Sequence, residues 1–172
     1  MIEKTKVLLV ADTYYPKVDG TLIFMQEFIK RAKEFDVHLL VPNFGKRIGD
    51  NVTYIKPSKH ISISGYKQSF GLHWKNFVKM RKAIKNADVL FVQGPAMISY
   101  MSLYYGKKYN KKTVFYTHTI AWELFEKFFP PLLNKLFFSF IKRMSIFLYN
   151  RCDEVLVPYE ELKSSLKREG VR

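Results

Sequence analysis

The fold is decided by the stretch Val7-Leu-Leu-Val-Ala-Asp-Thr-Tyr-Tyr-Pro-Lys-Val-Asp-Gly20, in which a short apolar run leads into a loop containing proline and glycine. A continuous apolar run of this length is typical of a strand buried on both faces. Apolar residues then recur at helical spacing through residues 21–34, with charged residues on the other side. The sequence therefore predicts a strand, a loop and an amphipathic helix in that order.

A second strand-like run, Val37-His-Leu-Leu-Val41, follows this helix and stops at Pro42. The beginning of the chain therefore reads as a β-loop-α-β unit. Its two strands are expected to be parallel, because a helix between two strands of one sheet forms a right-handed crossover.

The same alternation continues along the rest of the chain. Further strands are expected at residues 52–55, 89–92, 113–117 and 154–157. Helices are expected at about 72–86, 96–109, 120–150 and 159–168, the third interrupted at Pro130-Pro131. Such alternation favours an open, doubly wound, Rossmann-like α/β fold, with a parallel sheet and helices on both faces. Residues 1–172 are expected to form a single domain.

Charge is the most unusual feature of the composition. The chain has 29 Lys and Arg against 15 Asp and Glu, a formal net charge of +14. This excess favours an anionic partner, whether nucleic acid, an anionic membrane or a phosphorylated small molecule. Cys152 is the only cysteine, so the chain forms no internal disulfide and fits a reducing cytoplasm. Because neither a signal peptide nor a run of about 20 apolar residues is evident, we expect a cytoplasmic protein without a membrane span.

Polar residues follow several of the expected strands. Ligands of open parallel sheets bind outside the carboxyl ends of the strands, which here lead into residues 12–20, 93–96 and 117–123. The candidate residues in these loops are Asp12, Tyr14, Lys17, Asp19, Gly20, Gln93, Gly94, His118, Trp122 and Glu123. We expect them to meet at one rim of the sheet.

Gly20 and His118 have the most definite chemical roles among these candidates. Gly20 precedes a helix, where free backbone N–H groups favour a phosphate, although a glycine here can also simply supply a turn. His118 follows a strand at the ligand rim, where it can bind a ligand or transfer a proton, although a lone histidine is more often structural. The sequence shows neither metal-ligand spacing nor a glycine-rich dinucleotide or P-loop motif, so we predict no protein-bound metal.

The ordered motifs resemble a known family, the retaining glycosyltransferases of the GT-B fold, in particular the family 4-like lipid glucosyl- and mannosyltransferases. The stretch ending at Gly20 resembles the family's first strand and Pro/Gly loop, and Asp88-Val-Leu-Phe-Val-Gln-Gly-Pro95 resembles its fourth-strand motif. Val114-Phe-Tyr-Thr-His118 is similar to the strand that ends in histidine, and Cys152-Asp-Glu-Val-Leu-Val-Pro158 to the segment before the interdomain crossing. The likeness runs through nearly the whole chain.

The resemblance implies roles for the rim residues. Gly20 would lie near the donor diphosphate, although many relatives carry two adjacent glycines where this chain has Asp19-Gly20. His118 would line the cleft at the transferred sugar and assist catalysis by hydrogen bonding. The acceptor side would be formed by Asp12, Tyr14, Lys17, Asp19, Gln93, Trp122 and Glu123.

The resemblance also implies a metal-independent enzyme that needs no cofactor and uses a UDP- or GDP-hexose as donor substrate. The family's second domain, which binds the donor, is absent from this sequence. We therefore expect residues 1–172 to be the N-terminal, acceptor-binding half of the enzyme, inactive by itself. The implied reaction transfers a hexose, with retention, to a membrane lipid or a related acceptor.

A basic and aromatic helix suggests contact with the inner face of the cell membrane. Within residues 132–148, a core stripe is expected from Leu133, Leu136 or Phe137, Phe140, Met144 and Phe147. The opposite face is expected to carry Lys135, Phe138, Lys142, Arg143 and Ile146. Apolar residues among cations are typical of a helix at an anionic bilayer surface, although a solvated face with two incidental apolar residues is an alternative.

A second basic surface is expected within residues 56–82, where Tyr66, Phe70 and Trp74 stand among the cations. Single-stranded nucleic acid could stack its bases on such aromatic residues. Because no RRM, KH or helix-turn-helix signature accompanies them, nucleic acid ranks below a membrane. The alternative to a glycosyltransferase is a non-catalytic α/β module that uses its charge to bind nucleic acid or anionic membranes.

Overall fold

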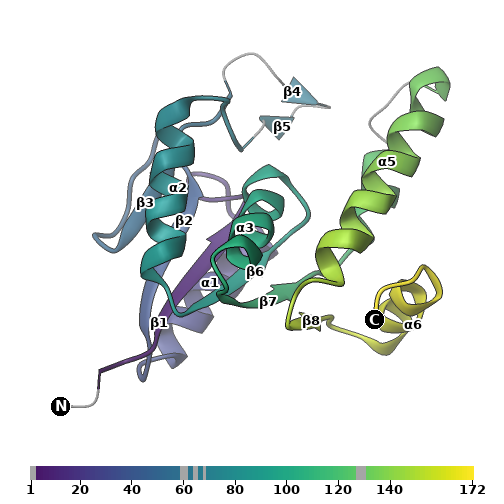
Figure 1. Cartoon of the computed structure of the whole chain (residues 1–172). Coiled ribbons are helices and arrows are strands. Elements are labelled where there is room, and N and C mark those ends of the chain that lie inside the picture. The colour runs from purple at the N-terminus through teal and green to yellow at the C-terminus, as the bar shows by residue number, and fades with distance from the viewer. Residues whose placement is uncertain (1–2, 59–61, 64–65, 68, 127–130) are drawn as a thin grey trace.

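The computed structural model describes residues 3–58, 62–63, 66–67, 69–126 and 131–172. Its main sheet has six parallel strands in the order β3-β2-β1-β6-β7-β8. They are β1 (Lys6–Ala11), β2 (Asp36–Pro42), β3 (Val52–Ile55), β6 (Val89–Gln93), β7 (Lys112–Tyr116) and β8 (Glu154–Leu156). The order changes direction between β1 and β6, as in a doubly wound Rossmann-like sheet (Figure 1). The predicted fold class is confirmed.

Helices cover both faces of this sheet. They are α1 (Gly20–Arg31), α2 (Trp74–Asn86), α3 (Met97–Lys108), α4 (Ala121–Glu126), α5 (Pro131–Tyr149) and α6 (Glu160–Arg168). Leu22 and Met25 of α1 pack on one face, in a cluster with residues of β1 and β2. A larger core on the other face joins the sheet to α2, α3, α5 and α6.

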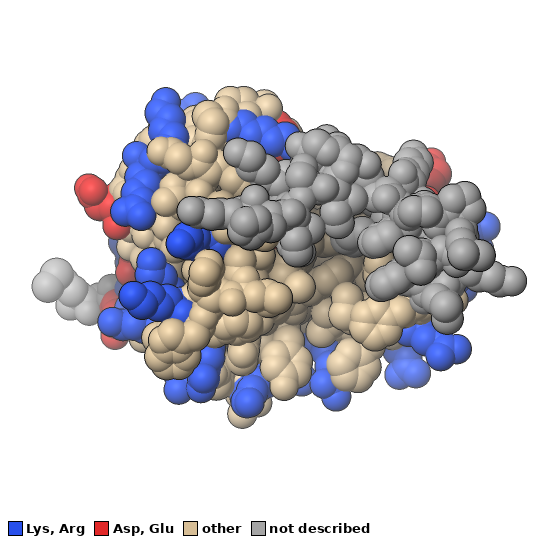
Figure 2. Space-filling view, turned by 90° about the horizontal axis from the view of Figure 1, so that it is seen from above, with Lys and Arg blue, Asp and Glu red and all other residues tan. Residues whose placement is uncertain are grey.

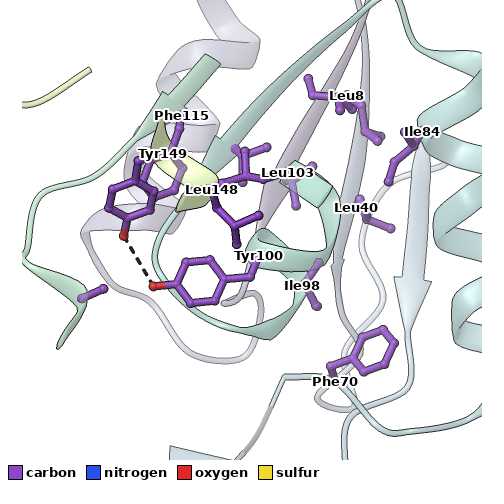
Figure 3. Packing of buried hydrophobic residues seen from close by; sticks show 14 of the residues in the cluster. Leu8, Leu40, Phe70, Ile84, Ile98, Tyr100, Leu103, Phe115, Leu148 and Tyr149 are labelled. Carbon is purple, nitrogen blue, oxygen red and sulfur yellow. Dashed lines mark hydrogen bonds between the residues drawn. The ribbon is translucent and has the colours of Figure 1, made fainter. Parts of the chain in front are cut away.

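The apolar run of β1 lies at the centre of both cores. Leu8 and Val10 belong to the larger core, whereas Leu9 and Ala11 belong to the cluster under α1. Successive side chains of a strand point to opposite faces, so a strand covered on both faces needs an unbroken apolar run. Figure 3 shows Leu8 within the larger core. The prediction of a doubly buried first strand is confirmed.

Buried contacts hold α3 against its neighbours. A Cβ atom at Gly106 would lie 2.4 Å from Leu90 Cδ1 and 2.7 Å from Thr113 Cγ2, so glycine permits the close approach of α3 to β6 and β7. On the other side of α3, the Tyr100 hydroxyl lies 2.7 Å from Ser145 Oγ and 3.5 Å from the Tyr149 hydroxyl (Figure 3). These hydrogen bonds join α3 to α5.

The predicted faces of α5 are wrong for four residues, whereas Met144 packs against the core as expected. Phe140 and Phe147, expected in the core, are exposed, whereas Phe138 and Ile146, expected on the outer face, pack against the core. Among the described side chains of α5, the buried ones are Ile141, Ser145, Leu148 and Tyr149. Apolar residues surround much of this helix, so helical spacing fits more than one face, and packing against α3 and the sheet selects one. The side chains of Leu133, Lys135, Leu136, Phe137 and Tyr66 lie outside the described part of the structure.

Three further details complete the fold. A small antiparallel pair, β4 (Ser62–Ile63) and β5 (Tyr66–Lys67), lies between β3 and α2, where the sequence predicts no strand. The expected interruption at Pro130-Pro131 corresponds to separate helices α4 and α5, with residues 127–130 outside the described residues. Among the described residues, no helix has the length and apolar character required to span a bilayer.

Candidate functional site

Asp12 follows β1 and holds the start of α3 in place. Its carboxylate accepts hydrogen bonds from the backbone N–H groups of Ile98, at 2.8 Å, and Ser99, at 3.1 Å. The hydroxyls of Ser69 and Ser99 donate to the same carboxylate. Burial raises the pKa of the Asp12 carboxyl, while these hydrogen bonds favour its charged form. Asp12 therefore acts as a helix cap supplied by a distant loop, and its oxygens are engaged inside the chain.

Gln93 ends β6 beside this cap and is fully buried. Ser99 connects the two residues, because its hydroxyl oxygen lies within hydrogen-bond distance of both the Asp12 carboxylate and the Gln93 carbonyl oxygen, the latter at 2.7 Å, and its one proton can be donated to either. The side-chain amide nitrogen and oxygen of Gln93 have no hydrogen-bond partner among the described residues. A buried amide without partners is costly, so this position favours a further polar partner at the switch point of the sheet.

The first turn of α1 presents an open backbone and a carboxylate. A Cβ atom at Gly20 would meet no atom within 4 Å, so packing does not explain the glycine. Asp19 caps the helix by accepting from the Leu22 N–H at 3.1 Å, and it also accepts from the Thr13 hydroxyl at 3.0 Å. The Lys17 ammonium lies 3.6 Å from Asp19. A phosphate bound at the N-terminus of α1 would therefore lie beside the Asp19 carboxylate, whose charge Lys17 partly neutralises.

Tyr14 is buried below this loop. Its hydroxyl donates to the Ile48 carbonyl oxygen at 2.9 Å, and burial raises the pKa of Tyr14 to about 12. The ring also packs edge-on against Tyr54, with 6.0 Å between the ring centroids. Tyr14 thus joins the loop after β1 to the loop before β3.

His118 follows β7 and is exposed at a depression of about 330 Å³. Glu123 lies on the same depression, together with Tyr159, Glu161 and Ser165 from the segment around α6. Hydroxyl, carboxyl and imidazole groups that face one hollow can hydrogen-bond a polyhydroxylated ligand. The Tyr116 ring centroid lies 6.0 Å from that of His118 and 5.1 Å from that of Phe24 in α1, so Tyr116 links the depression to α1.

Trp122 does not reach this depression, because it is buried in the larger core. The Lys142 ammonium lies 5.9 Å from its ring centroid and forms an ion pair with Glu169. Lys142 is thereby held between α4 and the C-terminal end of α6. Among the described residues, no cluster of three or more His, Cys, Asp or Glu side chains could hold a metal ion.

A family model described as Glycosyltransferase Family 4 matches residues 23–172. The chain belongs to glycosyltransferase family 4. The match includes His118 and Glu123 of this family 4 domain and begins after the loop that carries Asp12 and Gly20. The prediction of an N-terminal, GT-B-like glycosyltransferase domain is confirmed by the family and by the fold.

Two solved structures resemble this family 4 domain. A protein assigned as a UDP-N-acetylglucosamine 2-epimerase from Listeria monocytogenes is 14% identical, with a TM-score of 0.56 over 98% of this chain and 42% of that chain. The UDP-GlcNAc 2-epimerase from Methanocaldococcus jannaschii is 18% identical, with a TM-score of 0.51 over 99% of this chain and 43% of that chain. These likenesses show the fold alone, and this chain spans less than half of either protein. A comparison with curated protein sequences found no significant match.

The structure thus separates the predicted rim residues into groups. Asp12 and Gln93 lie together beneath the start of α3, Lys17, Asp19 and Gly20 lie together at α1, and His118 lies with Glu123. Their catalytic, phosphate-binding and acceptor-binding roles stay predictions. Sequence reasoning missed the residues that approach from distant segments, namely Ser69, Ser99, Tyr159, Glu161 and Ser165. The one sequence signal that could have pointed to these residues is that their segments contain hydroxyl and carboxyl side chains.

Proposed function

We propose that this family 4 domain is the acceptor-binding half of a retaining hexosyltransferase. The donor is a UDP- or GDP-hexose, the acceptor is a membrane lipid or a related molecule, and a second domain outside this sequence holds the nucleotide. The observation that carries the proposal is the exposed His118 in a polar depression at the carboxyl edge of a family 4 sheet. No step of the proposed reaction uses a metal or cofactor held by this chain.

The chemistry of the depression supports a role in holding a sugar. Its volume of about 330 Å³ is at the small end of the range for ligand sites, which suits one ring better than a long chain. Imidazole can both donate and accept a hydrogen bond, and carboxylates accept from sugar hydroxyls. His118 would therefore orient the transferred hexose, with Glu123 and Glu161 as acceptors for its hydroxyl groups.

The open backbone at Gly20 supports a place for the donor diphosphate. The first N–H groups of α1 and the positive end of its dipole favour phosphate oxygens. Asp19 opposes such binding by charge, and the Lys17 ammonium offsets part of that opposition. The acceptor-side roles of Asp12, Tyr14 and Gln93 would be indirect, because these residues position the loops that border the site.

Anionic lipid is proposed as a further partner, through a surface that differs from the predicted one. Of the residues predicted to contact the membrane, Lys142 is engaged with Glu169 and Trp122. Arg143 is exposed. α2 offers more charge, because its exposed side chains include Trp74 and the cations Lys75, Lys79, Arg81, Lys82 and Lys85. Figure 2 views the molecule from above. Lys and Arg lie mainly around the edge of this view, and the described residues at its centre are mainly uncharged.

The acceptor role is tested by titrating the ¹⁵N-labelled chain with dioctanoylglycerol, a soluble lipid with a free hydroxyl. We expect shifts of the backbone amides of His118 and Glu123, because the acceptor hydroxyl must reach the hexose site in the depression while the acyl chains stay outside it, and weaker shifts in the His118→Ala variant. His73→Ala is the matched control, since His73 is exposed at the start of α2 and makes no side-chain cap hydrogen bond. Shifts that spare the depression, or that are the same in both variants, would contradict the acceptor role.

The catalytic role is tested in the natural polypeptide that carries this sequence. Transfer from radiolabelled UDP-glucose and GDP-mannose to extracted lipids is expected to fall by about 10²-fold in His118→Ala, the usual scale for one positioned proton-transfer or hydrogen-bonding group. His73→Ala should leave transfer unchanged. Normal transfer by His118→Ala from both donors would remove His118 from the mechanism.

A further inference from the structure

A polar groove of about 620 Å³ lies at the other end of the sheet from the candidate site. It runs between the C-terminal half of α2 and the amino-terminal ends of β1, β2 and β3. Lys6 begins β1 at this end, whereas Asp12 follows β1 at the carboxyl edge. Six residues of strand separate the two ends by about 20 Å, so the groove is a separate site.

The floor of the groove is polar where the rest of this sheet face is apolar. Leu8, Leu40 and Ile55 pack in the larger core, and the residues two positions earlier on the same strands are Lys6, His38 and Thr53. Because side chains alternate along a strand, these residues face the same side as the core residues. The amino-terminal part of this sheet face therefore carries three hydrogen-bonding side chains, where the rest of the same face carries apolar core residues.

His38 is held rigidly in this floor. Its Nδ1 lies 2.6 Å from Asn51 Oδ1, and its Nε2 lies 2.7 Å from Thr53 Oγ1. Asn51 Nδ2 donates to the Val37 carbonyl oxygen at 2.6 Å, which fixes the orientation of the amide. Asn51 Oδ1 is thus the acceptor, and His38 Nδ1 carries the proton. The groove therefore has a preorganised polar wall.

Positive charge dominates the rest of the lining. Four Lys and Arg side chains line the groove against one carboxylate, that of Asp36. Lys6 is paired with Glu3 at 2.6 Å, whereas the Lys79 ammonium has only a long contact of 3.5 Å to the Tyr54 carbonyl oxygen. Lys82, one turn further along α2, has no hydrogen-bond or ion-pair partner among the described residues. Lys79 and Lys82 are therefore available to an anion.

We propose that this groove binds a small phosphorylated sugar. The phosphate lies between the ammonium groups of Lys79 and Lys82, and the sugar hydroxyls face the wall formed by His38, Asn51 and Thr53. The volume is within the range of small-molecule sites, and the combination of two cations with a neutral hydrogen-bonding wall matches a phosphate on a polyhydroxylated body. The site does not depend on the proposed transferase activity, because Gly20, His118 and Glu123 are not among its lining residues.

The first test is an NMR titration of the ¹⁵N-labelled chain with glucose 6-phosphate, with glucose and inorganic phosphate in parallel. We expect glucose 6-phosphate to shift the backbone amides of His38, Thr53 and Lys82 with a dissociation constant of about 1 mM or below. Glucose should not shift them, and inorganic phosphate should bind more weakly. The amides of Gly20 and His118 should not move. Shifts centred on those two residues, or no shift in the groove at about 10 mM ligand, would overturn the proposal.

The second test separates a built site from diffuse positive charge. The double variant Lys79→Gln/Lys82→Gln is expected to weaken glucose 6-phosphate binding by about tenfold or more. Its matched control is Lys75→Gln/Lys85→Gln, which removes the same charge from α2 at residues outside the groove. Equal weakening by both pairs would overturn the site. His38→Gln should weaken glucose 6-phosphate but not inorganic phosphate, and an equal effect on both would overturn the role of the wall.

Discussion

The interior and the rim of this domain use the same residue types in opposite ways. Trp122 is 1% exposed and packs in the core, whereas Trp74 is 73% exposed at the start of α2. A Cβ at Gly106 would overlap Leu90 and Thr113, whereas one at Gly20 would meet no atom within 4 Å. In the interior, packing explains the residue. At the rim, packing does not explain why the residue is present, so a role in ligand binding is the better explanation there.

The two capping aspartates show the same contrast. Asp12 reaches from the loop after β1 to cap α3 and is enclosed by donors from Ser69 and Ser99. Asp19 caps its own helix and keeps its side chain 30% exposed. A cap supplied across the fold fixes tertiary structure, whereas a cap supplied by the preceding residue fixes only a helix end.

Replacing the tryptophans gives the largest expected difference. Trp122→Ala should lower the free energy of unfolding by about 3–5 kcal/mol, because it leaves a cavity in the core. Trp74→Ala should change it by less than about 0.5 kcal/mol, because its side chain is exposed. Urea unfolding followed by far-UV circular dichroism measures both. Similar losses in the two variants would mean that Trp74 is also packed.

The glycines are expected to differ by a smaller amount. Gly106→Ala should cost about 1–3 kcal/mol, because the new methyl group overlaps Leu90 and Thr113 between packed elements. Gly20→Ala meets no atom and should stay within about 0.5 kcal/mol of the wild type. The same urea experiment decides between them. An unchanged Gly106→Ala protein would show that α3 can move away from the sheet at little cost.

Replacing the two capping aspartates, Asp12 and Asp19, should also change the stability of the fold by different amounts. Asp12→Asn should lower the free energy of unfolding by at least about 1 kcal/mol, because the amide group brings donors against the N–H groups of Ile98 and Ser99. Asp19→Asn should change stability by less than about 0.5 kcal/mol, since asparagine is an equally good helix cap. Thermal unfolding at neutral pH measures both changes. A larger loss for Asp19→Asn would reverse the assignment of structural and rim roles.

The smallest effect is expected from an exposed carboxyl group. Asp153 accepts hydrogen bonds from the Thr113 N–H, at 2.7 Å, and hydroxyl, at 3.1 Å, and the backbone hydrogen bond is the main reason that its pKa is lowered. A lowered folded-state pKa stabilises the fold above the ordinary value of 3.8, and this contribution is lost as the pH falls through the folded pKa.

Asp153→Asn should therefore lower stability at neutral pH by less than about 1 kcal/mol, with exposure limiting the size. It should also flatten the pH dependence of stability below the ordinary pKa of aspartate. Glu154→Gln is the control, because Glu154 is also exposed and forms a surface ion pair with Lys112 at 3.6 Å. Unfolding midpoints between about pH 2 and 7 measure both, and an unchanged acid slope in Asp153→Asn would contradict the predicted contribution.

Much of the fold could be predicted because its signals are local. The apolar run of β1 is long enough to identify a doubly buried strand, and Gly20 marks the start of α1. The faces of α5 could not be predicted, since Phe138, Phe140 and Phe147 compete for the same core and only contact with α3 decides among them. In the candidate site, the loop positions of His118 and Glu123 were predictable, whereas the hollow that they share with α6 was not.

The sequence by itself determined the alternation of strands and helices and the loops at the carboxyl edge, because periodicity and turn residues act within a few positions. The tertiary structure alone decided that Asp12 is a cap for α3, that Gln93 is buried without partners, and that His38 forms the wall of a cationic groove. Each of these depends on which distant segment packs beside the residue. A side chain takes its chemistry from its type, and its role from the neighbours that the fold brings to it.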